Sequence, residues 1–270
     1  MSLEEDRSIP PGLISRSDLL AAIEKDQLFL LYQPQMTPDG AMLASVEALV
    51  RWNHPARGPI GPASFVPMAE EFDMMDRLGA WVLERACREA QRWPRLSVAV
   101  NVSALQFRST RFAEEVEAIV RRSSLPFDRL ELEIVESAYI DDFGAAETVL
   151  RRLRALGIRI ALDDFGTGYS SLTYLRRLPL DKIKIDQSFV QEIDTVHSAA
   201  IVHAVVALGR ALGLKVTAEG VETEAQQRFM RAAGCHYLQG FLFSRPVPAE
   251  AIDGMLDRDG KAPLGAANVA

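Results

Sequence analysis

Eight short runs of apolar and β-branched residues recur along the chain, and segments with a helical pattern separate most of them. Alternation of this kind predicts parallel strands that are joined by helices on the outside of a sheet. The expected strands are Leu28–Met36, Leu43–Trp52, Leu96–Val102, Leu130–Val135, Ile158–Leu162, Lys182–Ile185, Lys215–Ala218 and His236–Gln239. The expected helices include Glu70–Trp93, Arg111–Arg122, Gly144–Leu156, Ser188–Leu212 and Thr223–Ala233. We therefore predict an α/β fold, a (β/α)8 barrel of the TIM type, with an open doubly wound sheet as the alternative.

The first two expected strands are joined by the four residues Thr37–Gly40 rather than by a helix. The sequence Thr-Pro-Asp-Gly is a hairpin signal, so the first strand should run antiparallel to the second. No Ser/Gly-rich linker, charge block or internal repeat divides the chain that follows. We expect one domain over residues 13–258, preceded by a linker or added residues at 1–12 and followed by a flexible tail at 259–270.

The overall charge limits the classes of partner. The chain has 270 residues and a formal net charge of −7, which argues against binding a DNA or RNA polymer, because that needs a basic surface. The most apolar segment, Ala199–Leu214, is interrupted by His203 and Arg210 and is too short to cross a bilayer, so no membrane insertion is expected. The two cysteines, Cys87 and Cys235, fit buried thiols in a reducing cytoplasm.

Polar side chains lie near the carboxyl ends of seven expected strands. They are Glu47, Asn101, Glu133 with Glu136, Asp163 with Asp164, Lys184 with Asp186, Glu219 with Glu222, and Gln239. In a barrel these ends converge on one mouth, where crowded carboxylates repel one another and are costly to ionise without cations. Oxygen ligands without His or Cys favour Mg²⁺ or Mn²⁺ over Zn²⁺ or Cu²⁺. The adjacent acids Asp163 and Asp164 suit two ions with one bridging carboxylate, an arrangement that serves in-line displacement at phosphorus.

Lys184 follows Asp163 by 21 residues and lies on the expected strand Lys182–Ile185. A lysine at a strand end of a barrel can form a Schiff base, which leaves a barrel aldolase as one alternative function. Such a lysine needs an apolar or cationic setting that lowers its pKa, whereas the neighbouring acids would keep Lys184 charged. A charged Lys184 that orients a water molecule and a phosphate fits the pattern better. Lys182 is expected at the surface.

Several motifs occur in a fixed order between Leu13 and Pro248. They are Tyr32-Gln33-Pro34, Glu47-Ala48-Leu49-Val50-Arg51-Trp52, Phe65 to Glu70, Asn101-Val102-Ser103, Glu133 to Glu136, Asp163 to Gly168, Lys184-Ile185-Asp186, Glu219 to Glu222 and Gln239-Gly240. With these motifs the chain resembles the EAL domains, which are cyclic di-GMP phosphodiesterases. The resemblance implies a (β/α)8 barrel with one antiparallel strand.

The resemblance also implies roles for individual residues. The ligands implied for one metal ion are Glu47, Asn101, Glu133 and Asp163, and those for a second ion, bridged by Asp163, are Asp164 and Glu219. The implied catalytic set is Lys184, Glu47 and Glu219, in which Lys184 would orient or help to deprotonate the nucleophilic water. The implied substrate contacts are Gln33, Leu49, Arg51 and Gln239. Glu136 would anchor the loop Asp163–Gly168, and Glu222 would support the shell of water and metal.

The implied reaction opens one phosphodiester of cyclic di-GMP, a bacterial second messenger, and gives linear 5′-pGpG with two Mg²⁺ or Mn²⁺ ions. Ca²⁺ would inhibit because its longer and looser coordination misplaces the nucleophile. A homodimer and an upstream sensory or GGDEF domain are expected by the same analogy. One departure lies at Phe72–Met75, where the family often has a Gly, and it would act on a guanine pocket. The second alternative function is a non-catalytic receptor, although no metal ligand, lysine or loop is lost here.

Overall fold

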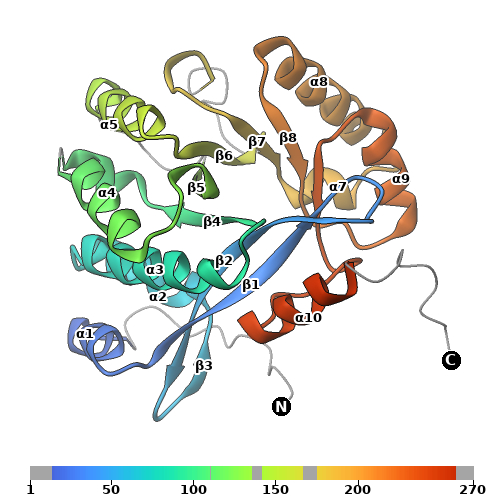
Figure 1. Ribbon diagram of the computed structural model, residues 1–270. Coiled ribbons are helices and arrows are strands. Elements are labelled where there is room, and N and C mark those ends of the chain that lie inside the picture. Colours follow the sequence, from blue (N-terminus) through green and yellow to red (C-terminus); the bar gives the residue numbers. More distant parts are fainter. Residues whose placement is uncertain (1–13, 110, 136–141, 167–174, 260–270) are drawn as a thin grey trace, which may run out of the picture.

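Eight strands close into a barrel in the computed structural model, which describes residues 14–109, 111–135, 142–166 and 175–259 (Figure 1). The strands are β1 (Leu28–Met36), β2 (Leu43–His54), β4 (Ser97–Val102), β5 (Leu130–Val135), β6 (Arg159–Phe165), β7 (Lys182–Ile185), β8 (Lys215–Ala218) and β9 (Tyr237–Gln239). Their order is β1-β9-β8-β7-β6-β5-β4-β2, and pairing of β1 with β2 closes the ring. β1 is antiparallel to both neighbours, and the other pairs within the ring are parallel. The predicted barrel with an antiparallel first strand is confirmed, and the open sheet is wrong.

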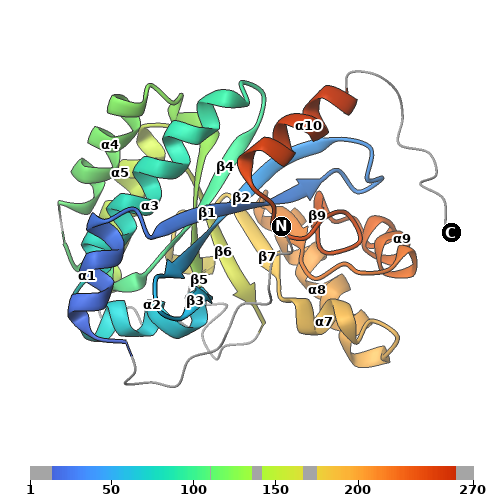
Figure 2. The same ribbon diagram turned by 90° about the horizontal axis from the view of Figure 1, so that it is seen from below.

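Helices cover the outside of this barrel (Figures 1 and 2). They are α1 (Arg16–Glu24), α2 (Pro62–Glu71), α3 (Met75–Glu89), α4 (Phe112–Ser123), α5 (Phe143–Ala155), α7 (Gln187–Gln191), α8 (Val196–Leu212), α9 (Glu224–Ala233) and α10 (Ala249–Asp259). Short 3₁₀ turns occupy Ala90–Arg92, Ala104–Arg108 and Phe127–Arg129. α10 contacts β1 and β2 and so covers the part of the barrel where the antiparallel hairpin replaces a βα unit.

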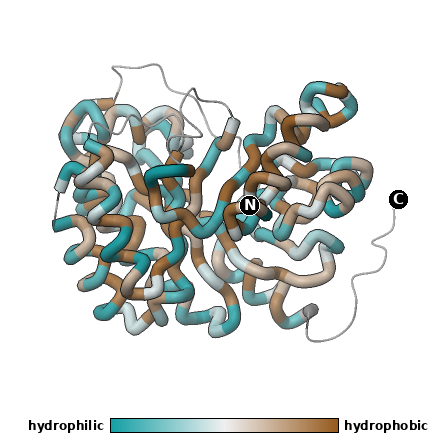
Figure 3. Tube along the Cα trace, turned by 90° about the horizontal axis from the view of Figure 1, so that it is seen from above, coloured by the Kyte–Doolittle hydropathy of each residue, from teal (hydrophilic) through white to brown (hydrophobic). Residues whose placement is uncertain are grey.

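The apolar core lies between the strands and the helices. On β4, Val98, Val100 and Val102 are buried and alternate with Ala99 and Asn101, because successive strand residues point to opposite faces. The tube of the helices in Figure 3 changes repeatedly between brown and teal, as expected for helices that bury one face. The valines therefore pack against the helices, and the alternate positions of the strand face the barrel interior.

Two expected helices are each divided in the structure. The segment expected as one helix over Glu70–Trp93 contains the end of α2, then α3 and a 3₁₀ turn, because Asp73 has a left-handed backbone with φ 52° that ends an α-helix. The segment Ser188–Leu212 contains α7 and α8, since the Thr195 side chain accepts a hydrogen bond from the Ser198 amide and starts a new helix. A short strand that was not expected, β3 (Gly58–Ile60), pairs with the end of β2.

Candidate active site

Within the described part of the chain, polar residues expected at the strand ends meet at one mouth of the barrel. The strands that carry them are β2 for Glu47, β4 for Asn101, β5 for Glu133, β6 for Asp163 and Asp164, β7 for Lys184 and β9 for Gln239, and Glu219 follows β8. The parallel register sets Asn101 beside Glu133, and the antiparallel hairpin sets Glu47 opposite Gln33. Side chains far apart in sequence are thus held by a rigid sheet.

Lys184 lies at the centre of this cluster, in contact with four carboxylates, and is completely buried. Its Nζ lies 2.6 Å from Glu219 Oε1, 2.7 Å from Glu133 Oε2 and 3.0 Å from Asp163 Oδ2. Its distance to Glu47 Oε2 is 3.4 Å. Burial lowers the pKa of Lys184, but the surrounding carboxylates outweigh burial and hold this pKa well above its usual value. The direction of this shift favours the charged ammonium form, which agrees with the expectation from the sequence.

Glu47 is fixed by two amide side chains. The Asn101 amide donates to Glu47 Oε1 at 2.7 Å, and the Gln239 amide donates to Glu47 Oε2 at 2.7 Å. Burial raises the pKa of Glu47, but Lys184 and these two hydrogen bonds outweigh it and lower the pKa below its usual value. Glu47 is thus an ionised carboxylate with a defined orientation.

An irregularity in β6 brings two adjacent acids to the same face. Side chains at consecutive strand positions normally point to opposite faces. Here the pairing of β6 with β7 shifts register between Leu162 and Phe165, and Asp164 has a left-handed backbone with φ 54°. The Asp164 amide donates to Asp163 Oδ1 at 2.9 Å. As a result, carboxylate oxygens of Asp163, Asp164 and Glu219 lie within 4.8 Å of one another.

Asp163 also belongs to a second cluster of carboxylates. One oxygen each from Glu47, Glu133 and Asp163 also lies within 4.8 Å of the other two. Among the described residues, Glu133 Oε1 is buried and accepts no hydrogen bond. An unsatisfied anionic oxygen in the protein interior is costly, and a cation would satisfy it. The donor set therefore fits two hard divalent cations bridged by Asp163.

The pKa shifts of the acids at the mouth also favour bound cations. Burial, together with neighbouring carboxylates, raises the pKa of Glu133 and Glu219 well above the usual value and raises that of Asp163. Burial and the charge of Asp163 raise the pKa of Asp164 to about 6. Five carboxylates and the Lys184 ammonium together have a formal charge of −4 when all are ionised. Two divalent cations would cancel this charge. The five are Glu47, Glu133, Asp163, Asp164 and Glu219.

Two cavities open beside this cluster. The first, of about 300 Å³, is lined by Gln33, Glu47, Leu49, Arg51, Asp163, Glu219, Glu222, Gln239 and their neighbours. The second, of about 860 Å³, is more apolar, and its lining includes Leu49, Val66, Pro67, Met75, Leu78, Asn101 and Asp164. The structure thus places the expected substrate contacts Gln33, Leu49, Arg51 and Gln239 beside the acids. Met75, from the departure at Phe72–Met75, lines the larger cavity. Glu136 and the end of the loop Asp163–Gly168 lie outside the described residues.

A buried ion pair below the cluster was missed in the sequence. Lys182 was expected at the surface, but its exposed fraction is 5%, and its Nζ lies 2.5 Å from Glu131 Oε1. Lys182 precedes Lys184 by two residues, as Glu131 precedes Glu133. Since positions i and i+2 of a strand share a face, this spacing was the signal that all four side chains point into the barrel.

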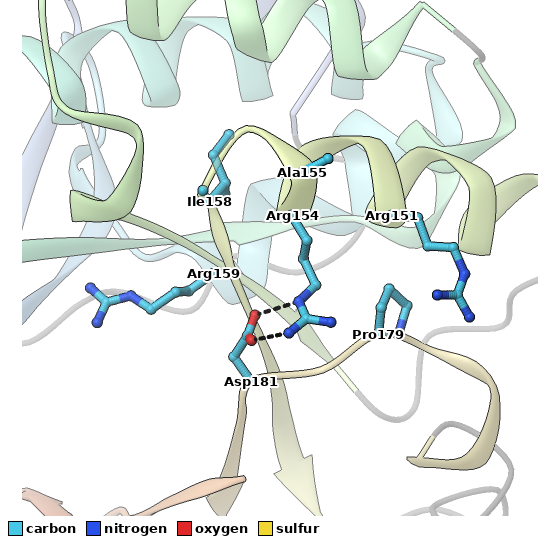
Figure 4. Close-up of a pocket in the computed structure, with 8 residues that line it drawn as sticks. Arg151, Arg154, Ala155, Ile158, Arg159, Pro179 and Asp181 are labelled. Atoms are coloured by element: carbon cyan, nitrogen blue, oxygen red, sulfur yellow. Dashed lines mark hydrogen bonds and ion pairs between the residues drawn. The ribbon is translucent and has the colours of Figure 1, made fainter. Parts of the chain in front are cut away.

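Another cavity, of about 350 Å³, lies at the opposite end of the barrel, where β6 and β7 begin (Figure 4). Arg154 donates to both oxygens of Asp181, at 3.1 and 2.6 Å. Arg151 and Arg159 point away from this pair in different directions (Figure 4), and Arg151 pairs with Glu147. The arginines of this cavity do not converge on a common point, so the pair of Arg154 and Asp181 is a structural contact.

Two further expectations concern the rest of the described chain. Cys87 and Cys235 are both buried free thiols, as predicted. Within the described ranges, no helix combines the length and the apolar character needed to span a bilayer.

Comparison with known proteins gives a consistent result. The EAL domain family matches residues 16–246. The bifunctional diguanylate cyclase/cyclic di-GMP phosphodiesterase MucR of Pseudomonas aeruginosa is 48% identical over 242 residues, which cover 87% of this chain and 35% of MucR. The cyclic di-GMP phosphodiesterase NbdA of the same species is 43% identical over 245 residues, covering 88% of this chain and 31% of NbdA. The chain thus spans about a third of the length of these relatives.

A solved structure agrees with this relationship. The PaMucR phosphodiesterase in complex with c-di-GMP superposes with a TM-score of 0.82 at 47% identity, covering 87% of this chain and 98% of that one. The family match over residues 16–246 includes all the strands of the barrel, from β1 to β9. The chain therefore belongs to the EAL domain family.

Proposed function

We propose that the protein is a cyclic di-GMP phosphodiesterase that hydrolyses one phosphodiester bond to give linear 5′-pGpG and so lowers the second messenger in bacterial signalling. The observation that carries the proposal is the pair of carboxylate groups that share Asp163, next to a cavity lined by Arg51. This arrangement fits a phosphodiester held against two cations. MucR and NbdA, which are named as phosphodiesterases of this nucleotide, support the choice of substrate.

The two metal sites follow from the two carboxylate groups. The residues that would hold one ion are Glu47, Asn101, Glu133 and Asp163, and those that would hold the other are Asp163, Asp164 and Glu219. When bound, two Mg²⁺ or Mn²⁺ ions lower the pKa of a water molecule and neutralise charge on the phosphate. Ca²⁺ is expected to inhibit, because its bonds are longer and its geometry is less strict.

Lys184 acts in this proposal as a fixed positive charge. Its raised pKa keeps it protonated, so it donates hydrogen bonds and orients the water and the phosphate. A protonated amine has no free electron pair and cannot attack a carbonyl group, which argues against the aldolase alternative. Glu47 and Glu219, which contact Lys184, complete the proposed catalytic set.

The two cavities provide complementary surfaces for a nucleotide. Arg51 would bind a phosphate, since its planar guanidinium group can donate two parallel hydrogen bonds. Gln33 and Gln239, which are joined by a hydrogen bond of 3.1 Å, would contact the nucleotide from β1 and β9. Leu49 lines both cavities, and the larger, more apolar one suits a purine base. Glu222 would support the ordered water around the metals, and Glu136 would anchor the loop after β6.

The proposal extends to the setting of the protein. A homodimer, a cytoplasmic location and an upstream sensory or GGDEF domain fit the family, and the matched segment covers only 35% of MucR and 31% of NbdA. DNA or RNA polymers and direct membrane insertion are not part of the proposal.

The decisive experiment mixes the purified protein with cyclic di-GMP and Mg²⁺ or Mn²⁺ and separates the products by chromatography. Metal-dependent formation of 5′-pGpG, lost with Ca²⁺ and in Glu47→Ala, is expected. Tight nucleotide binding without product would support the receptor alternative instead. A substrate-dependent adduct on Lys184 that borohydride traps would favour the aldolase. Full activity in Glu47→Ala would overturn the metal assignment.

A further inference from the structure

A second layer of polar side chains lies inside the barrel beneath the metal-binding cluster. Its members are Gln35, Ser45, Glu131, Lys182 and Gln239, and each is at least nine-tenths buried. The interior of a (β/α)8 barrel is usually filled by branched apolar residues. Burying an amide or a charge is costly unless each polar atom has a partner. A buried polar layer is therefore expected to have a structural or functional role.

These side chains form a continuous series of hydrogen bonds that ends on Glu47. The Lys182 ammonium donates to Gln35 Oε1 at 3.4 Å, and the Ser45 hydroxyl donates to the same oxygen at 2.7 Å. The Gln35 amide donates to Gln239 Oε1 at 3.0 Å. The Gln239 amide then donates to Glu47 Oε2 at 2.7 Å.

The direction of every bond in this series is fixed by its two ends. An ammonium ion can only donate and an ionised carboxylate can only accept, whereas an amide can be turned around to do either. With Lys182 at one end, Gln35 must present its oxygen to the lysine and its NH₂ group to Gln239. Gln239 must then present its own NH₂ group to Glu47, which agrees with the demand of the carboxylate at the other end.

We propose that Lys182 and Gln35 are positioning residues that orient the amide of Gln239 and thereby hold Glu47 in the orientation in which it binds metal. This inference rests on the proposed role of Glu47 as a metal ligand. Gln239 holds one oxygen of Glu47 while Asn101 holds the other. If the Gln239 amide were reversed, its oxygen would face a carboxylate oxygen, and repulsion would displace Glu47.

The test reverses the polarity of the series without changing its size. In Gln35→Glu the new carboxylate cannot donate, so Gln239 must turn its NH₂ group towards position 35 and its oxygen towards Glu47. Gln35→Met, of similar length, removes all three hydrogen bonds of the Gln35 side chain without reversal and is the matched control. Calorimetric titration of the metal-free protein with Mn²⁺, in the absence of nucleotide, measures the effect directly.

We expect Gln35→Glu to weaken Mn²⁺ binding about 10- to 100-fold, the usual range for partners of metal ligands, and Gln35→Met to weaken it less. In hydrolysis assays kcat should fall with the Mn²⁺ affinity, and KM for cyclic di-GMP should change as well, because Gln239 also faces the nucleotide cavity. Lys182→Met/Glu131→Leu removes the ion pair without leaving a buried charge and should weaken Mn²⁺ binding as well. Unchanged Mn²⁺ affinity in that double variant would exclude the role of Lys182.

A double-mutant cycle distinguishes a directed series from general damage to the fold. In a Gln239→Ala background, Gln35→Glu should cause no further loss of Mn²⁺ affinity, because the link to Glu47 is already broken. An equal loss in both backgrounds, or wild-type affinity in Gln35→Glu, would overturn the proposal. If the wild-type protein binds Mn²⁺ but does not hydrolyse cyclic di-GMP, only the proposed function fails. If it binds no Mn²⁺, the role of Glu47 and this inference both fail.

Discussion

Lys184 Nζ contacts one carboxylate oxygen of Glu133 at 2.7 Å, and the other oxygen of Glu133 accepts no hydrogen bond among the described residues. Both side chains are completely buried. The pair is therefore only half satisfied, in an interior where an unpaired anionic oxygen is costly. This relationship supports the proposal that a metal ion, rather than a further hydrogen bond, would satisfy the second oxygen of Glu133.

Glu133→Gln tests that relationship with an almost isosteric change. The amide has no charge to offer a cation and can at best supply one neutral oxygen. We expect Mn²⁺ affinity and kcat to fall together by at least about 100-fold, because a buried charged ligand is lost. Calorimetry and the hydrolysis assay measure the two effects. The exposed residue Glu224, changed to Gln, is the matched control and should behave as wild type.

Lys184→Met should abolish turnover and also make stability depend on metal. Removal of the ammonium leaves the buried carboxylates without a cation, and breaking a buried ion pair on one side costs roughly 3–5 kcal/mol. The metal-free variant should therefore unfold at a lower temperature than the wild type. Saturating Mn²⁺ should recover most of this loss, since cations replace the missing charge. If Mn²⁺ did not change the melting temperature of the variant, Lys184 and the metal ions would not both neutralise the buried carboxylates.

The pH dependence of stability should reverse when metal is present. The pKa of Asp164 is raised to about 6 from 3.8, so between these values the folded protein binds more protons than the unfolded chain. Stability of the metal-free protein should then fall as pH rises through this window, because ionisation is disfavoured in the fold. With Mg²⁺ the dependence should invert, since the metal requires the ionised form. Urea unfolding between about pH 4 and pH 7 measures both curves.

Asp164→Asn is the control for that pH dependence. Asn tolerates the left-handed backbone at φ 54°, so the bulge in β6 should survive the change. The variant should show a flatter pH profile in the metal-free state and weaker Mn²⁺ binding. A profile identical to that of the wild type would mean that Glu133, Asp163 and Glu219 alone carry the effect.

Asp181→Asn should separate stability from function. Asp181 accepts hydrogen bonds from Arg154 and from the Ile160 amide at the end of the barrel opposite the active site. Its loss should cost about 1–2 kcal/mol of unfolding free energy, the range for charge-assisted bonds near the surface. Turnover per folded molecule should not change. A large fall in kcat would show that this end of the barrel is coupled to the mouth.

Much of the site was predictable because it depends on a topological rule. Asn101, Glu133 and Asp163 lie near the ends of strands that can be recognised locally, and parallel strand ends in a barrel meet at one mouth. The joint position of Asp163 and Asp164 was predicted for the same reason. The bulge and the left-handed backbone that place both carboxylates on one face were not, because they depend on how β6 pairs with β7.

The sequence alone determined the order of the eight barrel strands, the antiparallel hairpin and the polar residues near the strand ends, because periodicity, turn residues and strand ends are local properties. The tertiary structure alone decided which charges are buried. Lys182 of β7 and Glu131 of β5 are separated by β6, on which Lys182 is in register with Ala161 and Glu131 with Arg159. Closure of the barrel turns both side chains into the same interior, and a lysine that a local pattern assigns to the surface becomes a buried ion pair.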